Sequence, residues 1–376
     1  MHPEFPLSSE ILYLNHAAVA PWPRRTVDAV SRFALENGTR GAAGYLKWMK
    51  TESRLRERLA ALINAESPAD IALAKNTSEA LSIIAYGLDW KPGDKIVGIA
   101  QEFPSNRIVR ESLTDQGVVY RQLDLYASAA PEDDLIALCD ERTRLLAVSS
   151  VQYARGLRLD LERLGSLCRR RGILFCVDAI QHVGVVPLDL TRCQADFVVA
   201  DGHKWMLGPE GVALLYVNPL VRPRLRLYQY GWHMVEHCGD YDRTDWAPST
   251  TATRFECGSP NMLGIQALDA SLSLLLETGM DAVHAAVAER VDRLIALIDQ
   301  RGFVLLSPRE PERRAGIVTF RVPGADPQAL YRALMGLGVI CAQRGGGVRF
   351  SPHFYTPESV LESAVDITAS AARKLL

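Results

Sequence analysis

Short apolar segments alternate with amphipathic helical patterns through the first two thirds of this chain. The apolar segments are rich in Val, Ile, Leu and Ala and show no polar face, so both sides of the strands they form should be covered. Strands of this kind separated by helices are typical of a mostly parallel sheet with helices on both faces. The predicted strands are 71–74, 95–99, 145–149, 174–178, 197–200 and 212–216.

Helical patterns fill the intervals between these strands. The helix after the first strand should be capped by Thr77 or Ser78 and end near Gly87. Gly172 is a typical C-terminal cap for the predicted helix 161–171. The pattern becomes more helical over 255–276. Beyond about residue 280, helices alternate with strands at 316–321 and 348–351, which indicates a smaller α+β domain. The other predicted helices cover 23–36, 52–63, a segment starting near 105, and 161–171.

Composition narrows the environment and the partners. The 376 residues carry 42 Lys and Arg against 44 Asp and Glu, a net charge of −2, which gives no electrostatic reason to expect nucleic acid or an anionic membrane as a partner. Seven cysteines with no C-x-x-C pair argue against a disulfide framework or a zinc ribbon and favour a reducing compartment. No basic and apolar leader and no long apolar run is evident. We expect a cytoplasmic protein.

Polar residues follow the ends of several predicted strands. Thr77 lies just after the first strand, Tyr153 beyond the third, Asp178 at the end of the fourth, and the fifth runs into His203 and Lys204. In open α/β sheets, ligands bind beyond the carboxyl ends of the strands. These side chains should therefore meet in one crevice.

The combination of a lysine, an aspartate and a helix N-terminus suits pyridoxal 5'-phosphate (PLP). A lysine amine forms an imine with an aldehyde. The N-terminus of a helix offers N–H donors and a favourable dipole to a phosphate. An aspartate beside a pyridine nitrogen keeps that nitrogen protonated, so that the ring can accept electrons. Each residue alone is weak evidence, and the prediction rests on their appearing together in this order.

Seven segments along the chain carry a family pattern: YLNHAA (13–18), NTSEA (76–80), QEFPSN (101–106), VDAIQHVG (177–184), DGHKWMLGPEG (201–211), FECGSPN (255–261) and VRFSPHFY (348–355). With these segments the chain resembles the class V aminotransferases, which are fold type I PLP enzymes. This group includes cysteine desulfurases, kynureninases and isopenicillin-N-epimerase-like proteins, and the last subgroup looks nearest. The resemblance implies a large domain with a mostly parallel seven-stranded sheet, a smaller C-terminal domain and a homodimer.

On this resemblance, the chain divides into three parts. Residues 1–20 are a segment packing near the active site, 21–255 form the large PLP-binding domain, and 256–376 hold an interdomain helix and the small domain.

The resemblance also implies residue roles. Lys204 would form the Schiff base and carry the proton, and Asp178 would pair with the pyridine nitrogen. Arg349 would bind the substrate carboxylate, which suits a guanidinium. Ser259 would reach the phosphate held by the partner subunit. The remaining cofactor contacts would be Gln181 to the phenolic oxygen, Thr77, the Ser78 backbone and His203 to the phosphate, Phe103 stacked on the ring, and Tyr153 nearby.

Departures from the family pattern limit the chemistry. Desulfurases place a nucleophilic cysteine on a loop ahead of the carboxylate-binding arginine, whereas Cys341 here follows a predicted strand and is expected to be a buried packing residue. Asp201 stands where desulfurases often have a phosphate-binding Ser, and an anion cannot take that role. Candidates for the substrate side-chain pocket are His16, Trp22, His233 and Arg344.

Several reactions remain open. Aminotransferase chemistry on a small-molecule amino acid is the first choice by resemblance, and elimination with C–S cleavage or epimerisation is second. His233, Glu236 and His237 match the H-x-x-E-H zinc pattern. That mechanism needs a stable helix, and this stretch lies between two glycines, so a zinc hydrolase is disfavoured. A non-catalytic binding protein on the same fold is a further alternative, against which the set Lys204, Asp178 and Arg349 argues.

Overall fold

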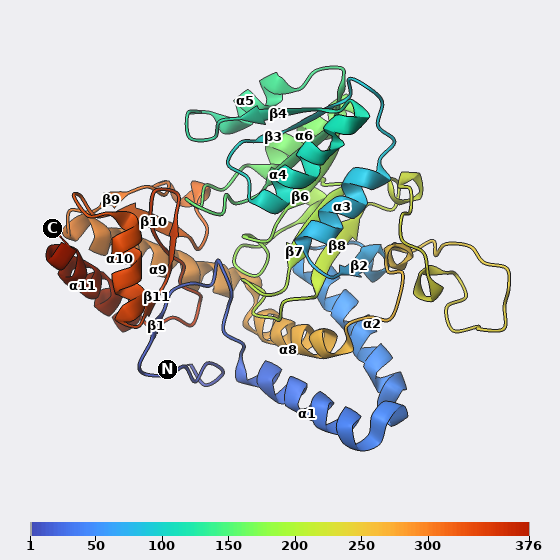
Figure 1. The fold of residues 1–376 in the computed structure, drawn as a ribbon, viewed down its shortest axis with the longest axis horizontal. Helices are drawn as coiled ribbons and strands as arrows, with labels where there is room; N and C mark the ends of the chain where they lie inside the picture. Colours follow the sequence, from blue (N-terminus) through green and yellow to red (C-terminus); the bar gives the residue numbers. More distant parts are fainter. Residues whose placement is uncertain (1, 376) are drawn as a thin grey trace.

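The computed structural model describes residues 2–375, which form a large α/β domain and a smaller α+β domain (Figure 1). The large domain is built on a seven-stranded sheet in the order β2-β8-β7-β6-β5-β3-β4, in which β8 alone runs antiparallel to its neighbours. The predicted mostly parallel sheet is thereby confirmed. Its strands are β2 (Ile71–Ala74), β3 (Lys95–Ile99), β4 (Val119–Leu123), β5 (Thr143–Ser149), β6 (Leu174–Asp178), β7 (Phe197–Asp201) and β8 (Ala213–Val217).

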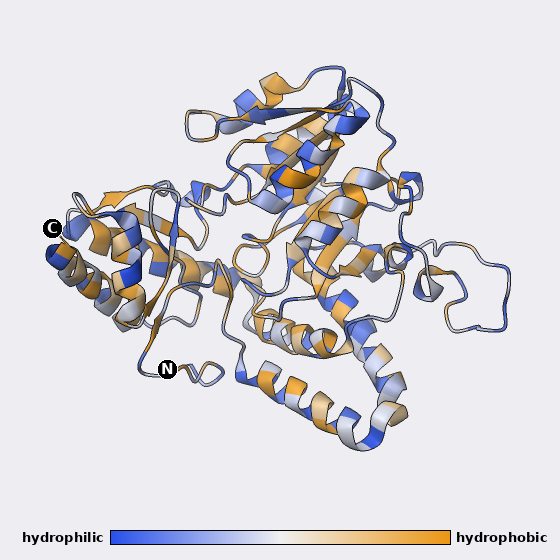
Figure 2. Cartoon of the chain, in the orientation of Figure 1, coloured by the Kyte–Doolittle hydropathy of each residue, from blue (hydrophilic) through white to orange (hydrophobic). Residues whose placement is uncertain are grey.

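Burial explains which strands the sequence revealed. The central strands β5, β6 and β7 are apolar and almost fully buried, and they form the hydrophobic centre of the large domain in Figure 2. Strand β4 was not predicted, because it lies at the sheet edge and carries exposed polar side chains such as Arg121 and Gln122. An edge strand packs on one face at most, so its sequence lacks a continuous apolar run.

Helices cover both faces of the sheet and extend below it. Helix α2 begins at Tyr45, seven residues before the predicted start, and α3 is capped by Asn76 instead of Thr77 or Ser78, with the Asn76 side chain accepting from Glu79 N at 2.9 Å. Helix α8 packs against α1 and α2. The helices are α1 (Arg24–Arg40), α2 (Tyr45–Leu62), α3 (Thr77–Gly87), α4 (Pro104–Glu111), α5 (Pro131–Leu138), α6 (Leu161–Arg171), α7 (Leu190–Cys193) and α8 (Met262–Thr278).

The small domain is a four-stranded antiparallel sheet in the order β12-β13-β10-β9 with three helices. The N-terminal segment joins it, because β1 (Leu12–Tyr13) pairs in parallel with β11 (Val339–Ile340). This pairing carries residues 17–19 into the space between the domains. The other elements are α9 (Met280–Gln300), β9 (Val304–Leu305), β10 (Val318–Arg321), α10 (Pro327–Gly336), β12 (Ala342–Arg344), β13 (Gly347–Phe350) and α11 (Glu358–Leu375).

Candidate active site

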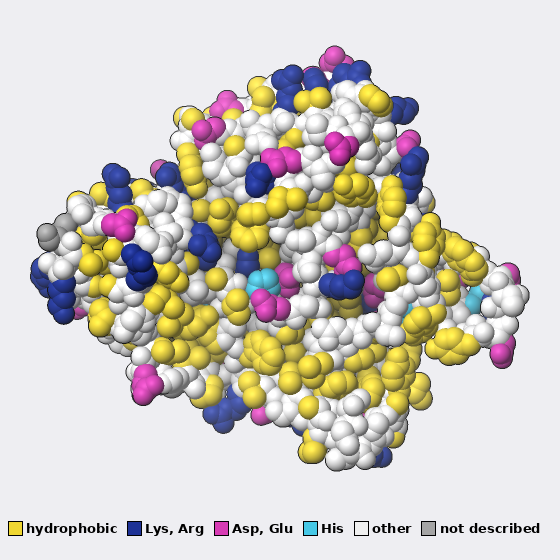
Figure 3. Space-filling view, in the orientation of Figure 1, with side chains coloured by type: hydrophobic (Ala, Val, Ile, Leu, Met, Phe, Trp, Pro, Cys, Tyr) yellow, Lys and Arg dark blue, Asp and Glu magenta, His cyan; other side chains and the backbone are white. Residues whose placement is uncertain are grey.

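A cavity of about 270 Å³ lies where the parallel strands of the large sheet end and the small domain begins. Strands β5, β6 and β7 end at Ser149, Asp178 and Asp201, and all three residues line it. Figure 3 shows charged side chains of both signs and a histidine gathered in the hollow between the two domains. The convergence expected from the strand ends is therefore present in the structure.

Lys204 follows β7 in a tight turn and is buried at 8% exposure. Its Nζ lies 5.5 Å from the centroid of the Phe103 ring. Burial lowers the pKa of Lys204 to about 8, while the Asp178 carboxylate acts in the opposite direction. About a tenth of this amine is then neutral at pH 7, and the neutral form is the nucleophile and the base.

Asp178 lies at the end of β6 with both oxygens engaged. Asn106 Nδ2 donates to its Oδ2 at 2.6 Å, and the backbone N–H of Ile180 donates to its Oδ1 at 3.0 Å. Burial raises the pKa of Asp178, whereas these two hydrogen bonds and the charges of Lys204 and Arg110 lower it. A cation in the cavity would lower the pKa of Asp178 further and keep the carboxylate ionised.

The N-terminus of α3 closes the opposite end of the cavity. The first turn of the helix presents Thr77 and Ser78, and Thr77 Oγ1 is buried with no hydrogen-bond partner among residues 2–375. His203 Nδ1 lies 3.0 Å from Asp201 Oδ1 but lacks the alignment of a hydrogen bond, so both atoms are also without a partner in the described chain. A helix N-terminus with unsatisfied donors is a site for a phosphate.

Arg349 on β13 brings a guanidinium to the wall formed by the small domain. It is 2% exposed, donates from one terminal nitrogen to Tyr153 O at 2.6 Å, and leaves its Nε without a partner among the described residues. Burial lowers the pKa of Arg349 to about 9, and the nearby Arg344 adds to this. Within residues 2–375 no carboxylate pairs with this buried cation. A buried cation of this kind is open to an anionic ligand.

Two aromatic rings stand beside the lysine. Phe103 and Tyr153 meet edge to face, with ring centroids 5.3 Å apart, and both line the cavity. Gln181 also lines it, but Trp205 Nε1 donates to its Oε1 at 2.7 Å and its Nε2 donates to Ala17 O at 2.9 Å. The second hydrogen on Nε2 and the second lone pair on Oε1 are left for a ligand. Arg344 contributes its side chain at the cavity mouth.

Some residues singled out from the sequence lie elsewhere. His16 is fully buried outside the cavity, with Nδ1 2.7 Å from Ser351 O and Nε2 2.6 Å from the Tyr355 hydroxyl. Its two ring nitrogens fasten the N-terminal segment to the small domain and leave nothing for a substrate. The expectation that His16 binds substrate therefore needs correction. Trp22 donates to Gly208 O at 3.1 Å and also stays outside the cavity.

The surroundings of the H-x-x-E-H segment and of Cys341 bear on the zinc-hydrolase and cysteine-nucleophile alternatives. His233 and His237 do not share a helix, because the short 3₁₀ turn there ends at Met234. No group of three His, Cys, Asp or Glu side chains in the described part of the chain is placed to hold a metal ion. Cys341 is 2% exposed and lies outside the cavity, and burial raises the pKa of its thiol to about 12. That thiol is protonated and enclosed, as expected for a packing residue.

Three residues of the site were missed from the sequence. Asn106 and Arg110 lie one turn apart on α4, and Glu102 precedes this helix. All three are buried and form hydrogen bonds that lead from Asp178 to Ser149. The spacing of Asn106 and Arg110 could have indicated a shared buried face, because residues four apart lie on the same side of a helix.

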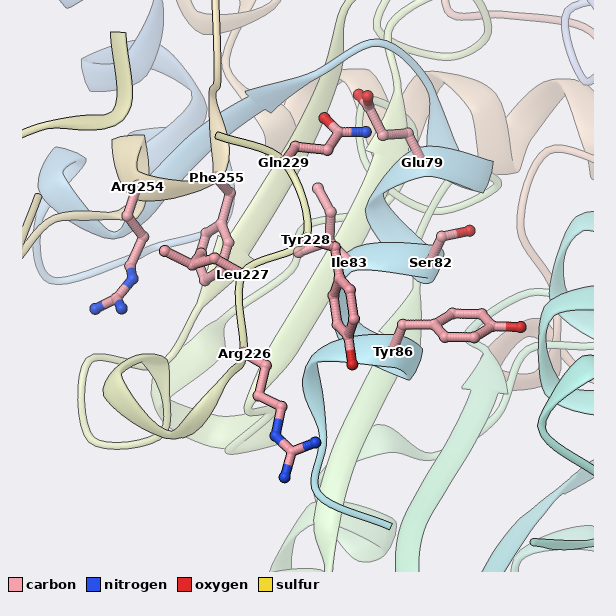
Figure 4. A pocket seen from close by; sticks show the side chains of 10 residues that line it. All are labelled: Glu79, Ser82, Ile83, Tyr86, Arg226, Leu227, Tyr228, Gln229, Arg254 and Phe255. Atoms are coloured by element: carbon pink, nitrogen blue, oxygen red, sulfur yellow. The ribbon is translucent and has the colours of Figure 1, made fainter. Parts of the chain in front are cut away.

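A second hollow lies on the outer side of α3 and opens to the surface (Figure 4). Its walls are mostly apolar and come from Ile83 and Tyr86 on α3 and from the segment 226–229. Ser259 lines a neighbouring hollow with Lys75 and Asn261 and does not face the cavity that holds Lys204.

Comparison with known proteins places this geometry in a family. Residues 12–357 match the family described as aminotransferase class-V. The chain belongs to this family. Its relatives include a probable cysteine desulfurase from Pyrococcus abyssi, 28% identical over 99% of this chain and 97% of the relative. They also include isopenicillin N epimerase from Streptomyces clavuligerus, 29% identical over 96% of this chain and 94% of the relative.

Solved structures share the fold of this class V chain. An apo cysteine desulfurase from Thermococcus onnurineus superimposes with a TM-score of 0.88 at 24% identity, covering 99% of this chain and 97% of that one. A C-DES mutant with glycine covalently linked to its PLP cofactor superimposes with a TM-score of 0.91 at 24% identity, covering 97% and 98%. These likenesses confirm the fold type I architecture.

PLP is the cofactor of this family, as predicted, and the cavity fits it. The buried Lys204 amine suits the aldehyde, Asp178 suits a pyridine nitrogen, and the unpartnered Thr77 Oγ1 at the start of α3 suits a phosphate.

Within residues 2–375, no helix combines the length and the apolar character needed to cross a membrane.

Proposed function

We propose that this enzyme acts on the amino group and α-carbon of a small-molecule amino acid, with transamination as its reaction. One observation supports this most: the buried Lys204 amine shares its cavity with the buried Arg349 guanidinium, which has no acid partner in the described chain. An α-amino acid supplies the carboxylate that Arg349 lacks and a Cα–H bond for Lys204. When bound, PLP supplies a protonated ring that accepts the electrons released at the substrate's α-carbon.

Arg349 and Lys204 divide the work between binding and proton transfer. Arg349 would hold the carboxylate and so fix which bond at the α-carbon faces the base. Lys204 Nζ, whose pKa is lowered to about 8 by burial, would take the α-proton and return it elsewhere. Asp178 would hold its negative charge against the pyridine nitrogen.

Phe103 in the cavity lining favours a reaction that needs one base. Epimerisation by two bases needs a second acid or base on the opposite face of the ring, and Phe103, which the resemblance places on a ring face, cannot take that role. Transamination and elimination both need only Lys204. Elimination with C–S cleavage is the second candidate, because several relatives are cysteine desulfurases. A persulfide carried on Cys341 is disfavoured by the burial of that thiol.

The substrate is proposed to carry a second acidic group. In the β12–β13 hairpin, Ala342 pairs with Arg349 and Arg344 pairs with Gly347, so Arg344 and Arg349 point to the same side. Diagonal positions of this kind put side chains within about 7–8 Å of each other. Arg344 at the cavity mouth could receive the side-chain acid while Arg349 holds the α-carboxylate. A dicarboxylic amino acid fits both positions.

We also propose a homodimer in which Ser259 of one subunit completes the phosphate site of the other. Ser259 does not face the cavity of its own chain. The neighbouring segment exposes large aromatic side chains, with Tyr230, Tyr241 and Trp246 each more than 60% exposed. The apolar hollow beside α3 (Figure 4) lies next to this segment and would be covered by the partner. Sedimentation of the PLP-loaded protein tests this, and a monomer would contradict it.

Product analysis distinguishes the reactions. The PLP-loaded protein is incubated with single amino acids, with and without a 2-oxo acid, and the new oxo acid, ammonia, sulfide and D-isomer are measured. Transamination predicts a new amino acid and oxo acid in equal amounts only when the 2-oxo acid is present. Ammonia and sulfide without a 2-oxo acid would establish elimination instead. A protein that binds PLP but whose absorbance no amino acid changes would refute an amino-acid-processing enzyme.

A further inference from the structure

A buried chain of hydrogen bonds leads from Asp178 into the interior of the large domain, away from the cavity. Asn106 Nδ2 donates to Asp178 Oδ2 at 2.6 Å, and Arg110 NH2 donates to Asn106 Oδ1 at 2.6 Å. The other terminal nitrogen of Arg110 donates to Glu102 Oε1 at 3.3 Å and to the Tyr120 hydroxyl at 3.1 Å. Asn106 is fully buried, and Arg110 and Glu102 are no more than 5% exposed.

The chemistry of arginine fixes the direction of this chain. A guanidinium can only donate hydrogen bonds, so the oxygen of the Asn106 amide must face Arg110. The amide nitrogen then faces Asp178, where it must find an acceptor. Asp178 Oδ2 is therefore required to accept, and its Oδ1 already accepts from Ile180 N. Both oxygens accept from donors, which favours the ionised carboxylate, and each oxygen keeps a second lone pair for a further donor.

Glu102 anchors the far end of the chain. The Ser149 backbone N–H donates to Glu102 Oε1 at 2.8 Å, and the Ser149 hydroxyl donates to Oε2. Ser149 pairs with Asp178 in the sheet, because β5 and β6 are adjacent and parallel. The chain thus starts and ends on neighbouring strands and is closed by the face of α4. Such a closed network leaves Arg110 little freedom to turn away from Asn106.

We propose that Asn106 and Arg110 are positioning residues that hold Asp178 as an ionised acceptor aimed at the pyridine nitrogen of PLP. Neither residue lines the cavity, so they act through Asp178 and not on the cofactor directly. Arg110 sets the orientation of the Asn106 amide, and Asn106 sets the rotamer and the charge of the carboxylate. Phe103, at the start of the same helix, faces the cavity, so α4 links the ring face to the carboxylate.

Substitutions at Asn106 separate this role from simple packing. Asn106→Leu keeps the size but removes the donor, and PLP should bind about tenfold to a hundredfold more weakly at every pH, the effect of losing one hydrogen bond to a charged group. Asn106→Asp places a second carboxylate beside Asp178. At high pH it should match the Leu variant. As the pH falls, the new carboxyl takes up a proton, can donate to Asp178, and should restore binding towards that of the unaltered protein.

Arg110 offers a second and independent pair of variants. Arg110→Lys keeps a group that only donates, so the amide should stay oriented and PLP affinity should remain within about threefold of the unaltered protein. Arg110→Met removes that constraint and should weaken PLP binding by about tenfold. The matched control is Arg107→Met on the same helix, because Arg107 is exposed and pairs with Glu111, so its loss should leave PLP binding unchanged.

The measurement is the PLP dissociation constant from absorbance and fluorescence titration of the apoprotein between about pH 6 and 9, together with the pH titration of the visible band of bound PLP. Far-UV circular dichroism and the melting temperature establish folding of each variant. The proposal is supported if the loss of PLP affinity in Asn106→Asp shrinks at low pH while the loss in Asn106→Leu does not. It is overturned if the loss of PLP affinity in Asn106→Asp does not change with pH, or if the Lys and Met variants of Arg110 bind PLP equally well. If both Asn106 variants fail to fold, the Arg110 pair decides.

Discussion

Replacing Arg349 by methionine should stabilise the protein without its ligands and strongly weaken substrate binding. Burial, with a contribution from the nearby Arg344, lowers the pKa of Arg349 from its ordinary value to about 9, which corresponds to a cost of ~5 kcal/mol for holding the charged group in the fold. The guanidinium stays charged in the folded and the unfolded chain at pH 7, so this cost is present in full. Removing it also removes the hydrogen bond to Tyr153 O, worth about 1–2 kcal/mol.

Methionine has a similar volume, is flexible and fills irregular space. The net increase in the free energy of unfolding should therefore be about 2–4 kcal/mol. The assay is urea unfolding of apoprotein with the melting temperature as a second measure, and the variant should melt several degrees higher. Substrate affinity, read from the absorbance of the PLP-loaded protein, should fall by about two to three orders of magnitude, as for loss of a buried charge pair.

Arg56 provides the matched control with the opposite sign. It is also buried, at 8% exposure, but it pairs with Glu52 and Glu256, each at 2.5 Å. Arg56→Met leaves both acids in the interior and should destabilise the protein by about 3–5 kcal/mol. The reasoning is refuted if Arg349→Met lowers the unfolding free energy by more than about 1 kcal/mol, or if it binds amino acids as well as the unaltered protein.

Three further outcomes follow from the site. Covalent capture of PLP by Lys204, trapped by reduction and measured by mass spectrometry, should accelerate with pH and level off above about 8, because burial lowers the pKa of this amine to that value; a midpoint near 10 would contradict this. Cys341 should resist thiol reagents in the folded protein and react after unfolding, since its thiol is buried and its pKa is raised to about 12; rapid labelling of the native protein would argue for an accessible nucleophile. Arg344→Gln should weaken the binding of glutarate by about tenfold and leave the binding of butyrate unchanged. Arg321→Gln, which changes an exposed residue on the same sheet, is the control. An equal effect on both acids would exclude a second anion site.

The sequence determined the architecture and the reactive groups. Buried parallel strands must be apolar on both sides, so β5, β6 and β7 could be recognised as continuous runs. Their ends had to meet at one edge, so the sequence alone places Asp178 and Lys204 together. The edge strand β4 was missed for the reverse reason, since a strand that is half exposed carries polar residues.

Only the tertiary structure decided which polar residues face the cavity. His16 and Gln181 carry similar hydrogen-bonding capacity in the sequence, yet the pairing of β1 with β11 buries His16 against Ser351 and Tyr355 and leaves Gln181 at the cavity wall. Asn106 gave no signal of its own, because its role depends on a helix face meeting a strand seventy residues away. Hydrogen-bond direction and the absence of a partner for a buried charge are properties of packed neighbours, and a linear pattern does not contain them.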